Sequence, residues 1–157
     1  MTKVVNENDH ERLIKDVVML AARILLESGA EGTRVEDTMN RIAKKLGYQE
    51  SNSFVTNTVI QFHLHNESTP RMFRINARDT NLIKISQANE ISRLITKGAI
   101  TLEEAKEKLE KIYVAKRDSS LPFKGFAAAM IAISFLYLQD GSLIDILTAL
   151  LLSLIHI

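Results

Sequence analysis

The carboxyl-terminal stretch from Gly125 to Ile157 constrains the fold most, because it contains no Lys or Arg and only two acidic residues, Asp140 and Asp145. Two apolar runs, Gly125–Leu138 and Leu143–Ile157, are separated by a short polar turn. Each run has 14 or 15 residues, whereas a straight crossing of a bilayer needs about 20. Length alone leaves a membrane hairpin and a pair of core helices both open, and the apolar character of both runs favours the membrane.

The part of the chain before this stretch is charged and mixed in character. It holds all 20 Lys and Arg residues and 17 of the 19 acidic residues, so it carries a small positive charge. A nucleic-acid-binding surface would gather more basic residues on one face, so we expect no nucleic-acid partner. The positive-inside rule places this part in the cytoplasm and the polar turn of the tail outside. The chain has no Cys, which excludes disulfides and is compatible with the cytoplasm.

Two helices are predicted at the amino-terminal end. Asn8 or Asp9 can cap a helix that runs to about Ser28, in which apolar residues recur at the spacing of one helical face. The segment Thr33–Glu36 has the pattern of a capping box, in which the Thr hydroxyl and the Glu carboxylate satisfy the first backbone amides of a helix. We expect this second helix to end at Gly47 and to form a helical hairpin with the first.

A change of period after the second helix predicts a β-hairpin. Over residues 53–65, side chains alternate between two faces, with Phe54, Ile60 and Phe62 on the same face. A turn follows, and the alternation resumes over residues 71–77. Because an isolated hairpin is only marginally stable, we expect it to pack against the helices.

A second helical pair completes the predicted soluble domain. Asp79 or Thr80 begins a helix that ends at Gly98, and a capping box at Thr101–Glu104 opens a charged helix after it. The predicted fold class is therefore α+β, in the order helical hairpin, β-hairpin and helical hairpin (ααββαα), followed by two apolar transmembrane helices. The predicted domains are a cytoplasmic α+β domain at residues 9–117, a linker at 118–124 and the start of an incomplete transmembrane bundle at 125–157.

Two groups of residues suggest catalysis or metal binding. His63 and His65 lie on one face of a predicted strand, a spacing that can bind a metal if carboxylates converge on it. Four carboxylates lie near the junction of the first two helices, where a pair of them could act as acid and base: Glu27, Glu31, Glu36 and Asp37. Neither pattern is complete, because no HExxH or CxxC motif is present and the capping box accounts for Glu36. We therefore predict no catalytic residue, no metal site and no cofactor.

Arg71, Arg74 and Arg78 form a basic run on and beside the second predicted strand. Guanidinium groups can bind a carboxylate through two parallel hydrogen bonds, so these residues are candidates for contact with a carboxylate-bearing ligand. The alternative interpretation is a solvated strand edge that charge protects from unwanted pairing.

Asp145 lies near one end of the second apolar run. If this run lies in a membrane, the carboxylate is costly there, and such groups mark an ion or substrate pathway or pair with a partner. The alternative is that Asp145 caps a helix in its first turn after Gly141 and Ser142. Asp145, followed by Arg74 and Arg78, is our candidate for the substrate or ion pathway.

Several of these stretches together resemble the threonine/serine exporter family. The first runs from Leu26 to Thr38 and reads LESGAEGTRVEDT. The others follow in the family's order: Arg74-Ile75, Arg78 to Ile85 (RDTNLIKI), Gly98 to Ala105 (GAITLEEA) and Gly141 to Asp145 (GSLID). No single stretch is diagnostic, but five in order make the resemblance fairly specific.

The resemblance implies a proton-coupled secondary exporter rather than an enzyme. Members export small amino acids such as threonine and serine, or in split relatives dicarboxylates, and a second membrane half can be a separate chain. We therefore expect an inner or plasma membrane protein with a cytoplasmic amino-terminal domain. Its expected partners are a small-molecule substrate, the membrane and the remaining transporter half, and a homo-oligomer is compatible with this prediction. The family residues carried over are Gly29, Glu31, Arg34, Glu36 and Arg78.

Such an exporter needs more membrane helices than the two expected here, and residues 152–157 resemble a translated sequencing-adapter tail. We therefore expect a truncated gene product, the amino-terminal part of an exporter that is not transport-competent by itself. One alternative is a membrane-anchored, metal-dependent hydrolase that uses Glu31, Glu36, His63 and His65. Another is a soluble interaction domain whose apolar helices pack in its own core or in a dimer.

Overall fold

The computed structural model describes residues 9–115, 121–140, 142, 144–146, 148–149 and 152. The chain divides into two compact units, Met1–Ala115 and Lys116–Ile157. The first unit contains four helices and three strands among its described residues: α1 (Asp9–Glu27), α2 (Gly32–Lys45), β1 (Asn52–Val55), β2 (Val59–His63), β3 (Arg71–Arg74), α3 (Leu82–Lys97) and α4 (Leu102–Val114). The second unit contains α5 (Leu121–Leu138).

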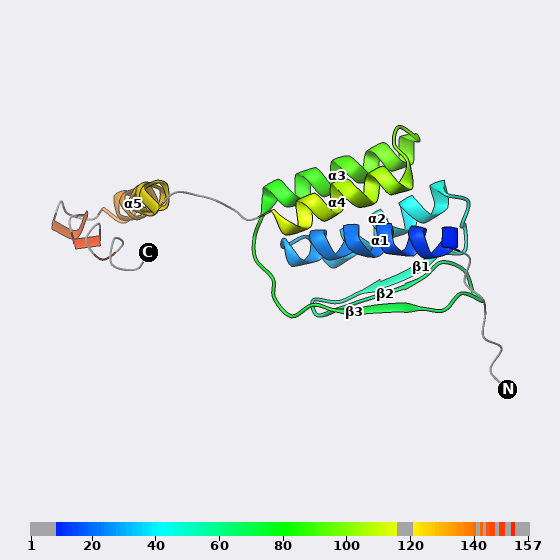
Figure 1. Cartoon of the computed structure of the whole chain (residues 1–157). Coiled ribbons are helices and arrows are strands. Elements are labelled where there is room, and N and C mark those ends of the chain that lie inside the picture. Colours follow the sequence, from blue (N-terminus) through cyan, green and yellow to red (C-terminus); the bar gives the residue numbers. More distant parts are fainter. Residues whose placement is uncertain are drawn as a thin grey trace. The chain divides into compact units, whose positions relative to one another are not determined.

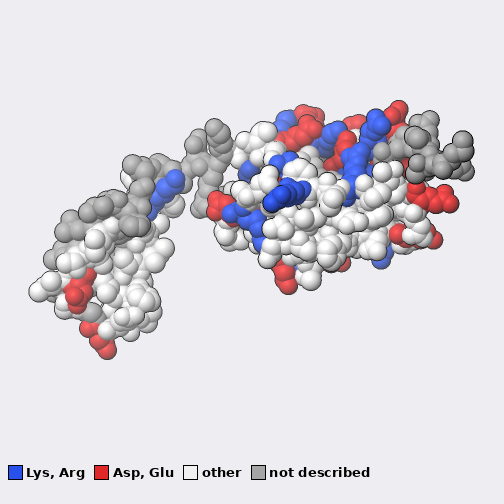
Figure 2. Space-filling model, turned by 90° about the horizontal axis from the view of Figure 1, so that it is seen from below, with Lys and Arg blue, Asp and Glu red and all other residues white. Residues whose placement is uncertain are grey.

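The first unit has three layers (Figure 1). An antiparallel sheet in the order β1-β2-β3 forms one outer layer, α1 and α2 form the middle, and α3 and α4 form the other outer layer. The α+β class is thus confirmed. Helices cover only one face of the sheet, and in the view onto the other face uncharged residues predominate, with charged side chains mainly around them (Figure 2).

Helix α1 is the centre of this core because it packs against α2, α3, α4 and β2. A helix that meets neighbours on several sides needs an apolar surface wider than a single stripe. Its sequence supplies one, and the buried apolar residues of α1 are Ile14, Val17, Val18, Ala21, Ala22, Ile24, Leu25 and Leu26. The predicted bounds of this helix, Asp9 to about Ser28, agree with the structure to within one residue.

The prediction of a single strand over residues 53–65 is wrong, because the chain reverses at Asn57 and Thr58 and forms two strands. The Thr56 N–H donates to the Val59 carbonyl at 2.9 Å, and the Val59 N–H donates to Thr56 Oγ1 at 3.1 Å. These bonds close a tight turn that the alternating pattern conceals. The reversal also changes which side chains face inward: Ile60 is buried as expected, whereas Phe54 is 60% exposed.

The two predicted capping boxes have different outcomes. At the start of α4 both bonds are present: Glu104 N–H donates to Thr101 Oγ1 at 3.2 Å, and Thr101 N–H donates to Glu104 Oε2 at 3.1 Å. At α2 the prediction is wrong, because the helix already begins at Gly32 with Glu31 as its N-cap residue. Thr33 is therefore inside the helix, and Glu36 accepts a bond from a strand instead of from its own helix terminus.

Helix α3 begins slightly later than expected. Its N-cap residue is Asn81, whose side-chain oxygen accepts from Lys84 N–H at 3.1 Å, rather than Asp79 or Thr80. Gly98 ends the helix as predicted, with a φ of 70°. This left-handed conformation is accessible to glycine without steric cost.

In the second unit, α5 begins at Leu121, inside the predicted linker 118–124. Most of its large apolar side chains are exposed, including Phe126 at 66% and Ile131 at 71%. Of the second apolar run, the structure describes only residues 144–146, 148–149 and 152, so most of that prediction lies outside the described residues. Within the described part of the chain, no helix has both the length and the apolar character required to cross a membrane.

Candidate functional site

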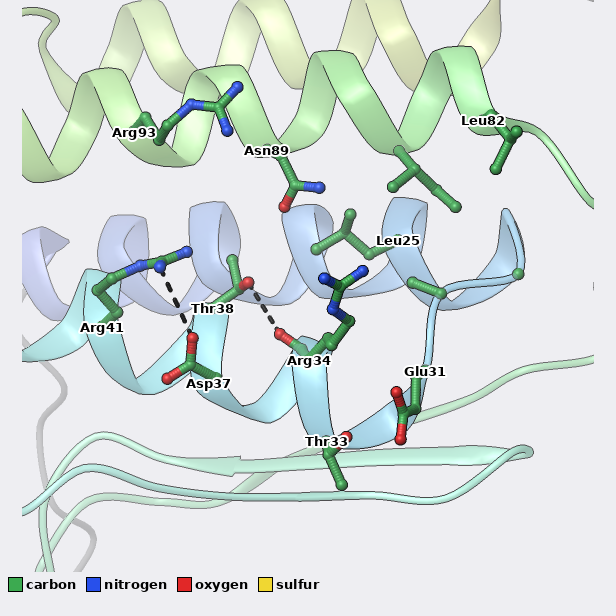
Figure 3. A pocket seen from close by; sticks show the side chains of 13 residues that line it. Leu25, Glu31, Thr33, Arg34, Asp37, Thr38, Arg41, Leu82, Asn89 and Arg93 are labelled. Atoms are coloured by element: carbon green, nitrogen blue, oxygen red, sulfur yellow. Dashed lines mark hydrogen bonds and ion pairs between the residues drawn. The ribbon is translucent and has the colours of Figure 1, made fainter.

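A hollow of about 720 Å³ lies in the first unit, bordered by α2, α3 and the connection between α1 and α2 (Figure 3). Four of its lining residues, Leu25, Ala30, Leu82 and Ile85, have apolar side chains, and most of the others are polar or charged. The complete lining consists of Leu25, Gly29, Ala30, Glu31, Thr33, Arg34, Asp37, Thr38, Arg41, Leu82, Ile85, Asn89 and Arg93. The stretch Leu26–Thr38 therefore supplies seven of the thirteen lining residues.

Arg78 fixes the α1–α2 connection at the edge of this hollow. Its Nε donates to the Leu26 carbonyl at 3.1 Å, and its Nη2 donates to the Ala30 carbonyl at 3.0 Å. Its Nη1 donates to Asn57 Oδ1 at 2.7 Å in the β1–β2 turn. One guanidinium thus joins two turns that are far apart in the sequence, so two of the resembling stretches are in direct contact.

Backbone bonds strengthen this junction. Asp79 N–H donates to the Glu27 carbonyl at 2.8 Å, and Asn81 N–H donates to the Ser28 carbonyl at 3.0 Å. Gly29 has a φ of 94°, and a Cβ atom there would lie 3.3 Å from the Asp79 carbonyl oxygen. Both the backbone conformation and the close approach therefore require glycine at this position.

The charged groups of the hollow are only partly paired. Asp37 and Arg41 form an ion pair at 3.6 Å, one turn apart on α2. Within residues 9–115, the guanidinium groups of Arg34 and Arg93 have no hydrogen bond or ion pair, and neither does the carboxylate of Glu31. Arg34 extends from α2 toward α3, and Asn89 extends from α3 toward α2 (Figure 3).

Glu36 lies outside this lining and connects α2 to the sheet. Its carboxylate accepts from the Val55 N–H at 2.7 Å, and its backbone carbonyl accepts from Ser53 Oγ at 3.3 Å. Of the five residues carried over from the family, Gly29, Glu31 and Arg34 line the hollow, and Arg78 and Glu36 position its walls.

The predicted basic run does not form one cluster. Arg71 pairs with Asp16 of α1, which also binds Lys106 Nζ of α4 at 3.1 Å. Burial raises the pKa of the Asp16 carboxyl, but the hydrogen bonds and charges of Arg71 and Lys106 outweigh burial, so the pKa lies below its ordinary value. Arg74 is exposed on the opposite face of β3, in register with Val59.

The two histidines also have separate neighbours. His63 Nε2 lies 3.1 Å from Gln61 Nε2, whereas His65 lies 3.5 Å from Glu11 and its ring stacks on Tyr48. Among the described residues, no group of three or more His, Cys, Asp or Glu side chains could hold a metal ion. In the described part of the chain, the four residues of the alternative hydrolase have separate neighbours and do not form one site: Glu31, Glu36, His63 and His65.

Asp145, in the second unit, makes the contacts of a helix cap. Its Oδ2 accepts from the Ser142 N–H at 2.9 Å and from the Ser142 hydroxyl at 2.7 Å, and the Asp145 N–H donates to Ser142 Oγ at 3.3 Å. These bonds are reciprocal, as in a capping box, and residues 144–146 are helical. The carboxylate is nevertheless exposed.

Sequence reasoning did not identify Asn89, Arg93 and Arg41 as members of one site. A signal was present: Arg34, Asp37, Thr38 and Arg41 recur at helical spacing on α2, and Asn89 and Arg93 lie four residues apart on α3. Such spacing places polar side chains on a common helical face. It does not show that the two faces border the same hollow, because that depends on how α2 and α3 pack.

Comparison with known proteins gives one match. A family model described as putative threonine/serine exporter matches residues 16–156. No curated protein and no solved structure matches the chain. The matched range contains the whole hollow, the sheet and α5.

Proposed function

We propose that this chain, which belongs to the threonine/serine exporter family, forms the amino-terminal part of a proton-coupled exporter of small amino acids or related carboxylates. The observation that carries the proposal is the family match over residues 16–156. This match includes both the α+β unit and the apolar helix α5. In this proposal the α+β unit is cytoplasmic and regulates, gates or assembles the transporter.

The proposed membrane part begins with α5. This helix has 18 residues, which corresponds to about 27 Å, so flanking residues would have to complete a crossing of the ~30 Å hydrocarbon core. Lys124 is its single basic residue, and a long side chain near a helix end can extend to the headgroups. The exposed apolar side chains of α5 support a position against lipid or against further helices of the exporter.

The remaining helices would come from the same or a separate chain, and a homo-oligomer would also extend the bundle. We propose that Asp145 contributes to the proton or substrate pathway, since an ionisable group in such a segment is costly to keep without a role. Arg74 is exposed and available to a carboxylate, whereas Arg78 acts by positioning the α1–α2 connection.

Membrane fractionation of cells that express the full chain tests the location. The chain is expected in the membrane pellet, to resist alkaline carbonate and to be released by detergent. Recovery in the cytosol without detergent would contradict the proposal.

Export of labelled threonine, measured in cells that also express the remaining transporter half, tests the activity. Asp145→Asn is expected to abolish the dependence of export on the proton gradient, because the amide cannot titrate. Asp140→Asn is the matched control in the preceding turn and should leave export unchanged. Equal, undiminished export by both variants would exclude Asp145 from the pathway.

A further inference from the structure

The hollow between α2 and α3 has a charge balance that suits an anionic ligand. It contains three arginines and two carboxylates, and the ion pair between Asp37 and Arg41 neutralises one charge of each sign. The remaining charged groups are the two guanidinium groups of Arg34 and Arg93 and one carboxylate, that of Glu31, so the hollow has a net positive charge. Within the described first unit, neither of these guanidinium groups has a protein partner, so their hydrogen-bond donors are available to a ligand.

The size and lining of the hollow also correspond to a small-molecule site. Its volume of about 720 Å³ lies within the ~300–1,000 Å³ that is usual for ligand pockets. Leu25, Leu82 and Ile85 supply an apolar portion for carbon atoms. Asn89 lies between the two arginines in the view of Figure 3 and offers both a donor and an acceptor.

The arrangement of the guanidinium groups limits the chemistry of the ligand. Arginine binds carboxylates through two parallel bonds and is therefore suited to planar anionic groups. Arg34 is on α2 and Arg93 is on α3, so a ligand that contacts both would join the two helices. Glu31 would attract an ammonium group, which a zwitterionic amino acid carries and a dicarboxylate does not.

We propose that this hollow binds a small organic carboxylate, an amino acid or a dicarboxylate, through Arg34 and Arg93. The inference rests on the proposed function in one respect: the bound carboxylate would report the cytoplasmic level of the solute that the exporter removes. A route for that signal exists in the first unit. Lys84 of α3 donates from Nζ to the Tyr113 carbonyl at 2.8 Å, near the end of α4 at Val114, so a shift of α3 would reach the last described residues of this unit.

Isothermal titration calorimetry of the detergent-solubilised full chain tests the proposal with three probes: L-threonine, succinate and L-threonine amide. At least one of the two carboxylates should bind, and the amide, which lacks a carboxylate, should not. Threonine binding alone identifies an amino-acid site, and succinate binding alone identifies a dicarboxylate site. Equal binding of the amide and threonine, or no binding of either carboxylate, overturns the proposal.

Variants then locate the site. Arg34→Gln and Arg93→Gln should each weaken binding about tenfold or more, because a charge-assisted hydrogen bond to the ligand is lost. Arg34→Lys should restore only part of the affinity, since an ammonium group cannot form the two parallel bonds. Arg12→Gln makes the same charge change at an exposed residue of α1 that does not line the hollow, and this variant should bind like the wild type. If Arg12→Gln weakens binding as strongly as Arg34→Gln, the site is not this hollow.

Thermal unfolding of each variant separates lost binding from lost folding. Arg34 and Arg93 are both exposed, so their variants should unfold at the wild-type temperature. A chain that fractionates with membranes and supports export but binds no carboxylate overturns this inference alone. A chain that binds a carboxylate but remains in the cytosol overturns the proposed function alone.

Discussion

Helices α1 and α5 have nearly the same length, 19 and 18 residues, but their apolar side chains have opposite surroundings. In α1 they are buried by the sheet and by three helices, and the charged residues of α1 other than the buried Lys15 lie on its remaining surface. In α5, apart from Lys124, no residue is charged, and Phe126 and Ile131 are exposed on the described surface of their unit. Apolar content alone therefore does not define a core helix. The charged face of α1 can contact water, whereas the exposed apolar side chains of α5 require contact with lipid or with further helices.

Truncation of one phenylalanine in each unit is the most direct way to break this comparison. Phe62 of β2 is fully buried, so Phe62→Ala should lower the free energy of unfolding of the first unit by about 3–5 kcal/mol through lost burial and a cavity. Phe126→Ala in α5 should leave that free energy unchanged. Denaturant unfolding of the detergent-solubilised full chain, followed by circular dichroism, measures both, and equal destabilisation would show that α5 belongs to the same core.

Within the first unit, two glycines have similar backbone conformations but different surroundings, so replacing each with alanine separates backbone strain from steric contact. Gly29 and Gly47 have φ of 94° and 99°, but only at Gly29 would a Cβ meet other atoms within 4 Å. Gly29→Ala should cost about 2–3 kcal/mol, since backbone strain and the contact with the Asp79 carbonyl add together, whereas Gly47→Ala should cost about 1–2 kcal/mol from strain alone. Equal shifts in denaturant midpoint would mean that the contact at Gly29 is relieved without cost.

Asp16 should make the stability of the first unit dependent on pH, an effect that α5, which contains no acidic residue, cannot provide. Because its pKa is lowered in the folded state, the stabilisation is present above the unfolded value of 3.8 and is lost as the pH falls through the folded pKa. Asp16→Asn should cost about 1.5 kcal/mol at pH 7, a value reduced by solvent screening, and less at pH 3. Unfolding of both proteins at the two pH values checks this, and a constant difference would exclude the linkage.

The smallest expected difference in the free energy of unfolding is between substitutions at the two predicted capping boxes. Thr101→Ala should destabilise the first unit by about 1 kcal/mol, because the Thr101 hydroxyl caps α4. Thr33→Ala is the matched control, because Thr33 is also followed by a Glu three residues later. Thr33 lies inside α2 rather than at its N-cap, so this replacement should leave the free energy of unfolding almost unchanged. A cost at Thr33 as large as that at Thr101 would mean that the sequence pattern, rather than the observed bonds, identifies the cap.

These two threonines also show how far sequence reasoning reaches. The α+β class, α1 and the end of α3 follow from local sequence patterns, and they were predicted correctly. A capping box has the same spacing whether the Glu bonds to its own helix or to a strand, so Glu36 was assigned incorrectly. Similarly, alternation over residues 53–65 cannot reveal the turn at Asn57 and Thr58, because it continues through the reversal.

The candidate site was less accessible to sequence reasoning than the fold. The family stretches identified Gly29, Glu31 and Arg34, and these residues do line the hollow. Asn89 and Arg93 lie four residues apart on α3, but this spacing alone does not distinguish them from other polar residues on a solvated helix. Their membership in the site depends on the packing of α3 beside α2, which is a tertiary property.

The three bonds of Arg78 have a consequence for the synthesis of the chain. Arg78 reaches back 48 and 52 residues to Ala30 and Leu26, so the α1–α2 connection cannot be fixed until Arg78 has left the ribosome. At about 5–20 residues per second, this delay is roughly 2–10 s. Throughout that interval helices α3 and α4 have not yet been made, so the apolar surface of α1 that they bury is uncovered and open to chaperones and proteases.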